Sequence, residues 1–335
     1  MPRAIVSQLR CVLGILGLVI TAGAPATVRA DIAYFTSFTT GALVRYDTSN
    51  PAGTATVLSG SGSTVKPSAL AIGPDGNLYI GEAGDVGTYA PRISRFNLST
   101  NSLSVVHTFA AFDVFPGSLA FKGSDLLVGR NPFFQNTGPI VKLAGATGGV
   151  LGVSDYTTGG TLASSPGLAL AADGSLYVSD QTYDFQSGQA SGPVKRFDPS
   201  GVYVGEVVAS GSNGLFGPTG LAINGSTLFT ASIMAGTIVQ TNLTTDATSP
   251  FASAVGPFGV GSLALLSDGG LLAGNPSGSG AIYRFGSDGT LLDTYSTGLG
   301  QIGGIVAVPE PSAVLLVVAG VACTSLRWLR SRRRA

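Results

Sequence analysis

The stretch "PSALAIGPDGNLYIGE" (67–82) decides the fold, because its pattern of an apolar triplet, a short turn and a second apolar triplet recurs along the chain. An Asp-Gly or Asn-Gly pair between two β-rich runs predicts a β-hairpin, with positive φ at both turn positions. The further copies are "PGSLAFKGSDLLVGR" (116–130), "PGLALAADGSLYVSD" (166–180), "PTGLAINGSTLFTAS" (218–232) and "GSLALLSDGGLLAGN" (261–275).

Each hairpin is followed by two more apolar runs. "PRISRFNLST" (91–100) and "GPVKRFDPSG" (192–201) exemplify the third strand of a unit, and "SLSVVHTF" (102–109) exemplifies the fourth. From Pro67 onward, successive units begin 49, 50 and 52 residues apart. Four antiparallel strands repeated about every 40 to 50 residues are typical of the blades of a β-propeller.

The two ends of the repeat region complement each other. "GGIVAV" (303–308) has the pattern of a first strand, whereas "IAYFTSFTTGALVRYDTSN" (32–50) has that of a second and a third strand. Joined, they make one more blade, and strands from both termini would close the ring and remove its exposed edges. The sequence therefore predicts an all-β, six-bladed propeller over residues 31–308.

The composition argues against several classes of function. Gly accounts for 49 of the 335 residues, without a collagen period, as a turn-rich repeat requires. Residues 31–308 hold ten Lys and Arg against seventeen Asp and Glu, a net charge of −7, which disfavours nucleic acid as a partner. Both cysteines, Cys11 and Cys323, lie outside this region, so it offers no thiolate nucleophile and no Cys-based zinc site.

Residues 1–30 have the order of a secretory signal peptide. Arg3 and Arg10 precede the apolar run 11–24, and Val28 and Ala30 stand at the positions that signal cleavage favours. We expect a signal helix that is removed on export. The alternative is a buried N-terminal helix of the fold.

The last residues, "VPEPSAVLLVVAGVACTSLRWLRSRRRA" (308–335), carry a second targeting pattern. The fifteen residues 312–326 are uncharged, and a helix of that length spans about 22 Å against the roughly 30 Å of a bilayer core. Five arginines follow within eight residues and would stay on the cytoplasmic side. The pattern predicts a marginal transmembrane-type helix, and a plain tail anchor is the alternative to a sorting signal.

Residues 309–335 resemble a PEP-CTERM sorting domain, because Pro309, Glu310 and Pro311 precede the apolar run and the arginines. The resemblance implies a Gram-negative-type bacterium, in which an exosortase and the export machinery would be partners. The protein would be anchored transiently in the membrane and delivered to the cell surface or the extracellular matrix.

The hairpin "LAIGPDGNLYI" (70–80) followed by "ISRF" (93–96) resembles the propellers of the NHL-repeat and SMP-30/gluconolactonase-like families. In such folds the loops between second and third strands gather at one face, around the central channel. Aromatic residues in the longer of these loops would suit a ligand there. The polar candidates at the starts of these loops are Glu82, Asp85, Arg130, Asn131, Asp180, Gln181, Ser232 and Asn275.

The gluconolactonase-like resemblance implies a calcium ion held by carboxylate and amide oxygens. Glu82, Asn131, Asp180 and Asn275 stand at equivalent positions of four blades and could supply such oxygens. The first blade departs from this pattern, since it offers only Ser37 and Phe38.

Catalytic residues of other kinds are scarce. His107 is the sole histidine of the chain, on a predicted outer strand, so no Ser/His/Asp set can form around it. The sequence therefore favours an exported, non-enzymatic binding or structural module without a cofactor. Its surface partners would be exopolysaccharide or other surface proteins. The alternative is a calcium-dependent, lactonase-like hydrolase on the channel face.

Overall fold

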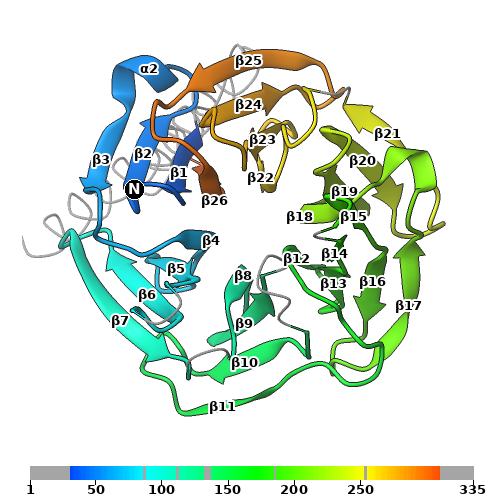
Figure 1. Cartoon of the computed structure of the whole chain (residues 1–335), viewed down its shortest axis with the longest axis horizontal. Helices are drawn as coiled ribbons and strands as arrows, with labels where there is room; N and C mark the ends of the chain where they lie inside the picture. Colours follow the sequence, from blue (N-terminus) through cyan, green and yellow to red (C-terminus); the bar gives the residue numbers. More distant parts are fainter. Residues whose placement is uncertain are drawn as a thin grey trace, which may run out of the picture.

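Six four-stranded antiparallel sheets surround a central axis in the computed structural model (Figure 1). The structure describes residues 31–309 except 86–87, 111–112, 132–136, 185 and 253–254. The predicted signal helix (1–30) and residues 310–335 of the predicted sorting segment lie outside the described residues. The prediction of a six-bladed, all-β propeller is confirmed.

In every blade the first strand is innermost and the fourth outermost (Figure 1). Blade 1 consists of β26 (Ile302–Pro309), β1 (Asp31–Ser37), β2 (Leu43–Asp47) and β3 (Thr56–Ser59). Blade 2 consists of β4 (Pro67–Ile72), β5 (Leu78–Glu82), β6 (Arg92–Asn97) and β7 (Ser102–Thr108). Blade 3 consists of β8 (Pro116–Lys122), β9 (Asp125–Arg130), β10 (Val141–Ala144) and β11 (Gly152–Asp155).

The other three blades follow the same order. Blade 4 consists of β12 (Leu168–Leu170), β13 (Leu176–Ser179), β16 (Val194–Phe197) and β17 (Tyr203–Val208). A small hairpin of β14 (Thr182–Asp184) and β15 (Gln189–Ser191) lies between its second and third strands. Blade 5 consists of β18 (Pro218–Asn224), β19 (Thr227–Ser232), β20 (Thr237–Asn242) and β21 (Thr248–Ala252). Blade 6 consists of β22 (Ser262–Leu265), β23 (Leu271–Gly274), β24 (Ala281–Phe285) and β25 (Leu291–Ser296).

Helix is almost absent from the described chain. Its helical segments are α2 (Pro51–Thr54) and the 3-10 turn η2 (Ser212–Gly214). Within residues 31–309, apart from the gaps above, no helix has the length and apolar character needed to cross a membrane.

The ring closes through blade 1, as predicted. β26 pairs antiparallel with β1, and Ile32 lies opposite Val308. The pairing extends to Asp31 opposite Pro309, one residue beyond the predicted end of the propeller. The first proline of the predicted sorting motif is thus the last residue of the closing strand.

The hairpin turns differ from the prediction. In blade 2 the N–H of Gly73 bonds the carbonyl of Asn77, which leaves a three-residue loop, and Gly76 has a φ of +75° whereas Asp75 has no positive φ. Asp75 instead accepts a hydrogen bond from the N–H of Asn77 at 3.2 Å. Such a loop is a type I turn followed by a glycine in the left-handed region, so only the glycine needs positive φ.

Six apolar cores lie between neighbouring blades, one for each contact of the ring. The core between blades 1 and 2, for example, contains Tyr34, Leu43, Leu70 and Phe96. Clusters of the same kind occupy the other five contacts. The alternation of side chains along each strand supplies one face to the blade before and the other to the blade after.

The inner strands approach one another closely around the axis. A Cβ at Gly303 of β26 would lie 1.8 Å from the carbonyl oxygen of Pro67 in β4, so only glycine fits there. Hydrogen bonds also join neighbouring blades at this level: Ser118 Oγ donates to the carbonyl of Ser165 at 2.6 Å, and the N–H of Gly220 donates to Gly261 at 2.6 Å.

Candidate functional site

The starts of the inner strands and the ends of the second strands share one face of the ring. Pro67 lies opposite Glu82, Pro116 opposite Arg130, and Pro218 opposite Ser232. We call this the loop face, because the loops between second and third strands and the loops that precede the inner strands both lie on it.

A cavity of about 560 Å³ follows the central axis and is lined by inner strands of all six blades. This volume lies within the range of small-molecule sites. Its residues at the loop face include Phe38, Asn131, Gln181 and Gln301. The sequence had pointed to this face, and the structure places two of the polar candidates, Asn131 and Gln181, on the cavity wall.

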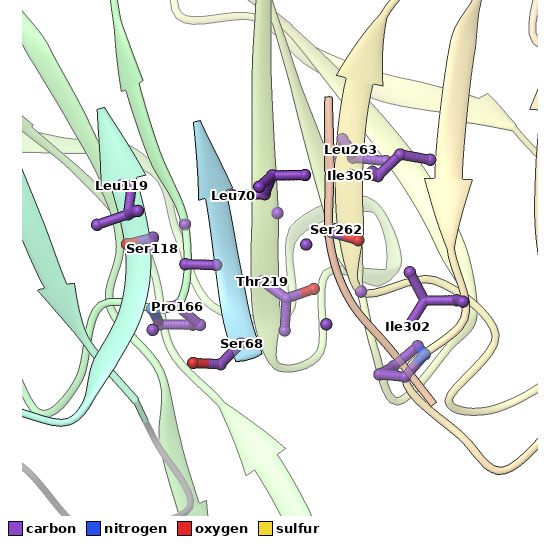
Figure 2. Close-up of a pocket in the computed structure, with 18 of the residues that line it drawn as sticks. Ser68, Leu70, Ser118, Leu119, Pro166, Thr219, Ser262, Leu263, Ile302 and Ile305 are labelled. Atoms are coloured by element: carbon purple, nitrogen blue, oxygen red, sulfur yellow. The ribbon is translucent and has the colours of Figure 1, made fainter. Parts of the chain in front are cut away.

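The wall changes character along the axis. Ser68 and Thr219 line the cavity one step below the loop face, and a ring of aliphatic side chains follows deeper along the inner strands (Figure 2). Figure 2 shows Leu70, Leu119 and Leu263 at one level and Ser68 at another. One residue from each blade forms the aliphatic ring: Leu70, Leu119, Leu168, Leu221, Leu263 and Ile305.

Glu82, the last residue of β5, is a structural residue of blade 2. Its side chain is fully buried, and Arg92 donates to both of its oxygens at 2.9 Å. The N–H of Val65, in the loop before β4, donates to Oε2 at 2.7 Å, and Ser94 Oγ donates to Oε1. Both carboxylate oxygens are therefore used to hold the loop and the third strand of the same blade.

Asp180 repeats this arrangement in blade 4. Lys195 Nζ lies 2.5 Å from Oδ2, and the N–H of Ala163, in the loop before β12, donates to Oδ1 at 2.7 Å. In both blades the backbone donor stands seventeen residues before the acid. The two acids thus have the same role, although their bases differ.

The equivalent residue binds the loop before its inner strand in three further blades, with different chemistry. Ser37 Oγ donates to the carbonyl of Leu299 at 2.6 Å. Arg130 Nη1 donates to the carbonyl of Asp113 at 2.7 Å, and Ser232 Oγ accepts from the N–H of Phe216 at 2.8 Å. We call these residues the latch residues: Ser37, Glu82, Arg130, Asp180 and Ser232.

The remaining candidates have other surroundings. Asn275, the counterpart of the latch residues in blade 6, accepts from the N–H of Ser277 at 2.6 Å. Asp85 forms an ion pair with Lys66, and both side chains are partly exposed.

Burial lowers the pKa of the Arg130 guanidinium, and the negative charges of Asp113 and Asp155 partly offset this effect.

Three of the four predicted calcium ligands already have partners, and the fourth, Asn131, lies on the cavity wall. Glu82 and Asp180 are each paired with a base and a backbone N–H, and the Asn275 side-chain oxygen is bonded within its own loop. Across the described part of the chain, no three His, Cys, Asp or Glu side chains gather where they could hold a metal ion. A calcium ion at Glu82 or Asp180 would compete with the base and the backbone N–H that each acid already binds.

His107 lies on the outer strand β7, as predicted, and its ring packs edge-on against Phe109 at 4.7 Å. Burial lowers the pKa of His107, with Asp113 acting in the opposite direction. Tyr89, one of the loop aromatics, is 52 % exposed, and it is not part of the cavity wall.

Most residues of the cavity wall are not among the polar candidates that the sequence predicts. The residue that follows each latch residue, or its blade 6 counterpart, lines the cavity in five blades: Phe38, Asn131, Gln181, Ile233 and Pro276. Only the two amides among them belong to the predicted candidates, because polarity at a loop start indicates Asn131 and Gln181 but not Phe38, Ile233 or Pro276. The positional rule would have found the other three.

Solved structures share this fold at low sequence identity. A chain of the crystal structure of a nidogen/laminin complex is 12 % identical with a TM-score of 0.65, covering 83 % of this chain and 98 % of that one. A putative 6-phosphogluconolactonase from Bacteroides uniformis is 19 % identical with a TM-score of 0.53, covering 80 % and 83 %. A protein of unknown function from Bacteroides caccae is 16 % identical with a TM-score of 0.56, covering 84 % and 100 %.

These likenesses place the chain in the structural class of six-bladed β-propellers and show the fold alone. No family model matches the chain, and no curated protein matches it. The resemblances to PEP-CTERM, NHL-repeat and SMP-30-like proteins stay predictions.

Proposed function

We propose that this propeller is an exported, non-catalytic binding module that takes its ligand into the central channel from the loop face. One observation carries the proposal: the described residues that line the 560 Å³ cavity include no acid, no base and no histidine. Hydrolysis needs a general acid or base, or a metal ion, within reach of the reacting bond. The acids at the ends of β5 and blade 4's second strand, Glu82 and Asp180, are engaged by bases.

The proposed location rests on the sequence of the two ends. The signal-like residues 1–30 and the motif Pro309-Glu310-Pro311 support export and exosortase-type sorting to the surface or matrix. Asp31 and Pro309 pair at the end of blade 1 opposite to Ser37 and Ile302, which mark the loop face. A tether that follows Pro309 would therefore leave the ligand face directed outward, toward exopolysaccharide or other surface proteins.

A lactonase-like hydrolase is the second candidate, supported by the fold it shares with the putative 6-phosphogluconolactonase. Purified full-length protein separates the two functions when it is offered lactones with and without Ca²⁺. We expect no hydrolysis above the buffer rate under either condition. Calcium-dependent turnover would overturn the binding proposal.

Sorting is tested by mass spectrometry of the C-terminus of the protein isolated from its native cell surface. We expect a chain that has lost Arg332, Arg333 and Arg334. Recovery of the intact arginines on the mature surface form would contradict exosortase-type processing.

A further inference from the structure

We propose that the ligand of the channel is an uncharged amphiphile that enters from the loop face with its apolar end first. This inference rests on the proposed function and names the ligand class of the same site. It is carried by two features of the wall: the lack of charge over the described residues that form it, and the order in which polar and aliphatic side chains follow one another.

The first feature excludes charged ligands. A charged group moved from water into a wall without a counter-ion loses its hydration and gains no partner. Two acids of the loop face are paired with bases, Glu82 with Arg92 and Asp180 with Lys195. Each of these pairs is neutral and lies inside its own blade, so it contributes little field to the channel. Arg130 turns away from the channel and donates to the carbonyls of Pro139 and Asp113.

The second feature sets the direction of binding. Along β4, the five consecutive residues 68–72 line the cavity, which at about 3.3 Å per residue corresponds to a depth of about 13 Å. Ser68 lies at the loop-face end of this run, and Leu70 and Ile72 lie deeper. Leu70 belongs to the ring of six aliphatic side chains, so an apolar group gains most from burial at that level.

The loop-face end of the cavity, which we call the mouth and which Phe38, Gln181 and Gln301 line, supplies hydrogen bonds for an uncharged head group. Gln301 and Phe38 lie side by side, because the N–H of Phe38 donates to the carbonyl of Gln301 at 2.8 Å. The side chain of Gln301 makes no hydrogen bond to any other described residue, and it lines the cavity. Gln181 Nε2 donates to the carbonyl of Pro218 at 3.3 Å, which fixes its amide at the cavity wall.

The experiment uses four probes on the full-length chain, by calorimetric titration below the micelle concentration. Octyl β-D-glucoside has an uncharged head, octanoate an anionic head and octylammonium a cationic head, whereas glucose has no tail. We expect octyl glucoside to bind at one site, at least about tenfold more tightly than each of the others, a difference of about 1.4 kcal/mol.

Variants at the mouth locate the site. Phe38→Ala and Gln301→Ala should each weaken octyl glucoside binding by roughly fivefold or more. The matched controls Phe216→Ala and Gln240→Ala change the same residue types outside the cavity, and they should bind like the unmodified chain. Circular dichroism and thermal unfolding identify variants that have lost the fold.

Three results would overturn the inference: equal affinity for octanoate or octylammonium, binding unchanged in both mouth variants, or no binding of any probe. The same preparations are assayed for lactone hydrolysis and for retention on matrix isolated from the producing cells. Retention of the protein on the matrix without binding of any probe would contradict the amphiphile inference and leave the proposed function intact. Lactone hydrolysis, or recovery of the native protein from the cell interior, would contradict the proposed function, whatever the probes show.

Discussion

Two neighbouring positions at the ends of the second strands have opposite surroundings in most blades. The latch residues, among them Glu82 and Asp180, turn into their own blade and bind the loop that precedes the inner strand. The next residue along the chain, such as Gln181 after Asp180, faces the central cavity instead. The first position carries charge in three of the five latch residues, and the second is uncharged at every place where it lines the cavity.

The difference shows that charge on this face serves to hold the blades in shape. A latch must bind backbone groups of a loop, and any side chain with a donor or an acceptor can do so, which explains how Ser, Glu, Arg and Asp share one role. At the channel position the side chain lines the cavity, and Gln181, for example, donates to the carbonyl of Pro218 in the next blade. Polar residues at strand ends are therefore a poor guide to the site unless the two positions are separated.

The largest expected effect comes from breaking a latch in the buried interior. Glu82→Ala would leave Arg92 without its counter-ion and the N–H of Val65 without an acceptor. We expect a loss of about 3–5 kcal/mol in the free energy of unfolding. Urea denaturation of the variant measures it, and Glu82→Gln, which keeps the volume, serves as the control. A loss below about 1 kcal/mol would mean that Glu82 is not structural.

Asp180→Ala tests whether the second acidic latch has the same role. It removes the ion pair with Lys195 and the bond from Ala163, and we expect a loss of about 2–3 kcal/mol. A double-mutant cycle with Lys195→Ala separates the pair from the loop contact. Stability that rises on adding Ca²⁺, and does so less in Asp180→Ala, would instead make Asp180 a metal ligand.

The turn between β4 and β5, at the face opposite to the loop face, contains a carboxyl group whose contribution to stability depends on pH. Burial alone would raise the pKa of Asp75, but hydrogen bonds from Asn77 and Tyr79, with the charge of Arg95, hold it below its usual value. Burial and the same Asp75 raise the pKa of Tyr79 to about 12. A depressed carboxyl pKa stabilises the fold above the unfolded value, near pH 4, and this contribution is lost as the pH falls through the folded pKa.

Asp75→Asn should therefore lower the denaturation midpoint at pH 7 and converge with the unmodified protein below about pH 4. Midpoints measured from pH 7 to pH 3 check this, with Asp155→Asn on the exposed strand β11 as the control. A constant offset between the two proteins across this range would contradict a role for the Asp75 charge.

The smallest effect on stability is expected at the mouth. Gln301→Ala removes a side chain that bonds no other described residue, so the free energy of unfolding should change by less than about 0.5 kcal/mol. Chemical denaturation beside Glu82→Ala gives the contrast directly. A loss of unfolding free energy as large as that of Glu82→Ala would mean that Gln301, like the latch residues, stabilises the fold.

Most of the architecture could be read from the sequence because each blade repeats its own local signals. The Asp-Gly turns and apolar triplets place the hairpins, and the unmatched strand patterns at 32–50 and 303–308 reveal the closure. The turn type could not be read, because Asp75 binds the N–H of Asn77 and leaves only Gly76 with positive φ.

The site was less accessible, for a physical reason. That Glu82 meets Arg92 depends on the register of β5 and β6, and that Phe38 meets Gln301 depends on a contact between residues at opposite ends of the chain. Polarity alone selects Glu82 and passes over Phe38. Position relative to the inner strand would have separated them.

Under the proposed function, the closing strand would also couple the channel to tension on a tether. β26 contributes five consecutive residues, 302–306, to the wall of the cavity, and it ends at Pro309 on the far side. A pull applied beyond Pro309 acts along the strand, so the six paired positions of β1 and β26 resist it together, in shear. Slippage of β26 along β1 would displace residues 302–306 along the wall of the channel.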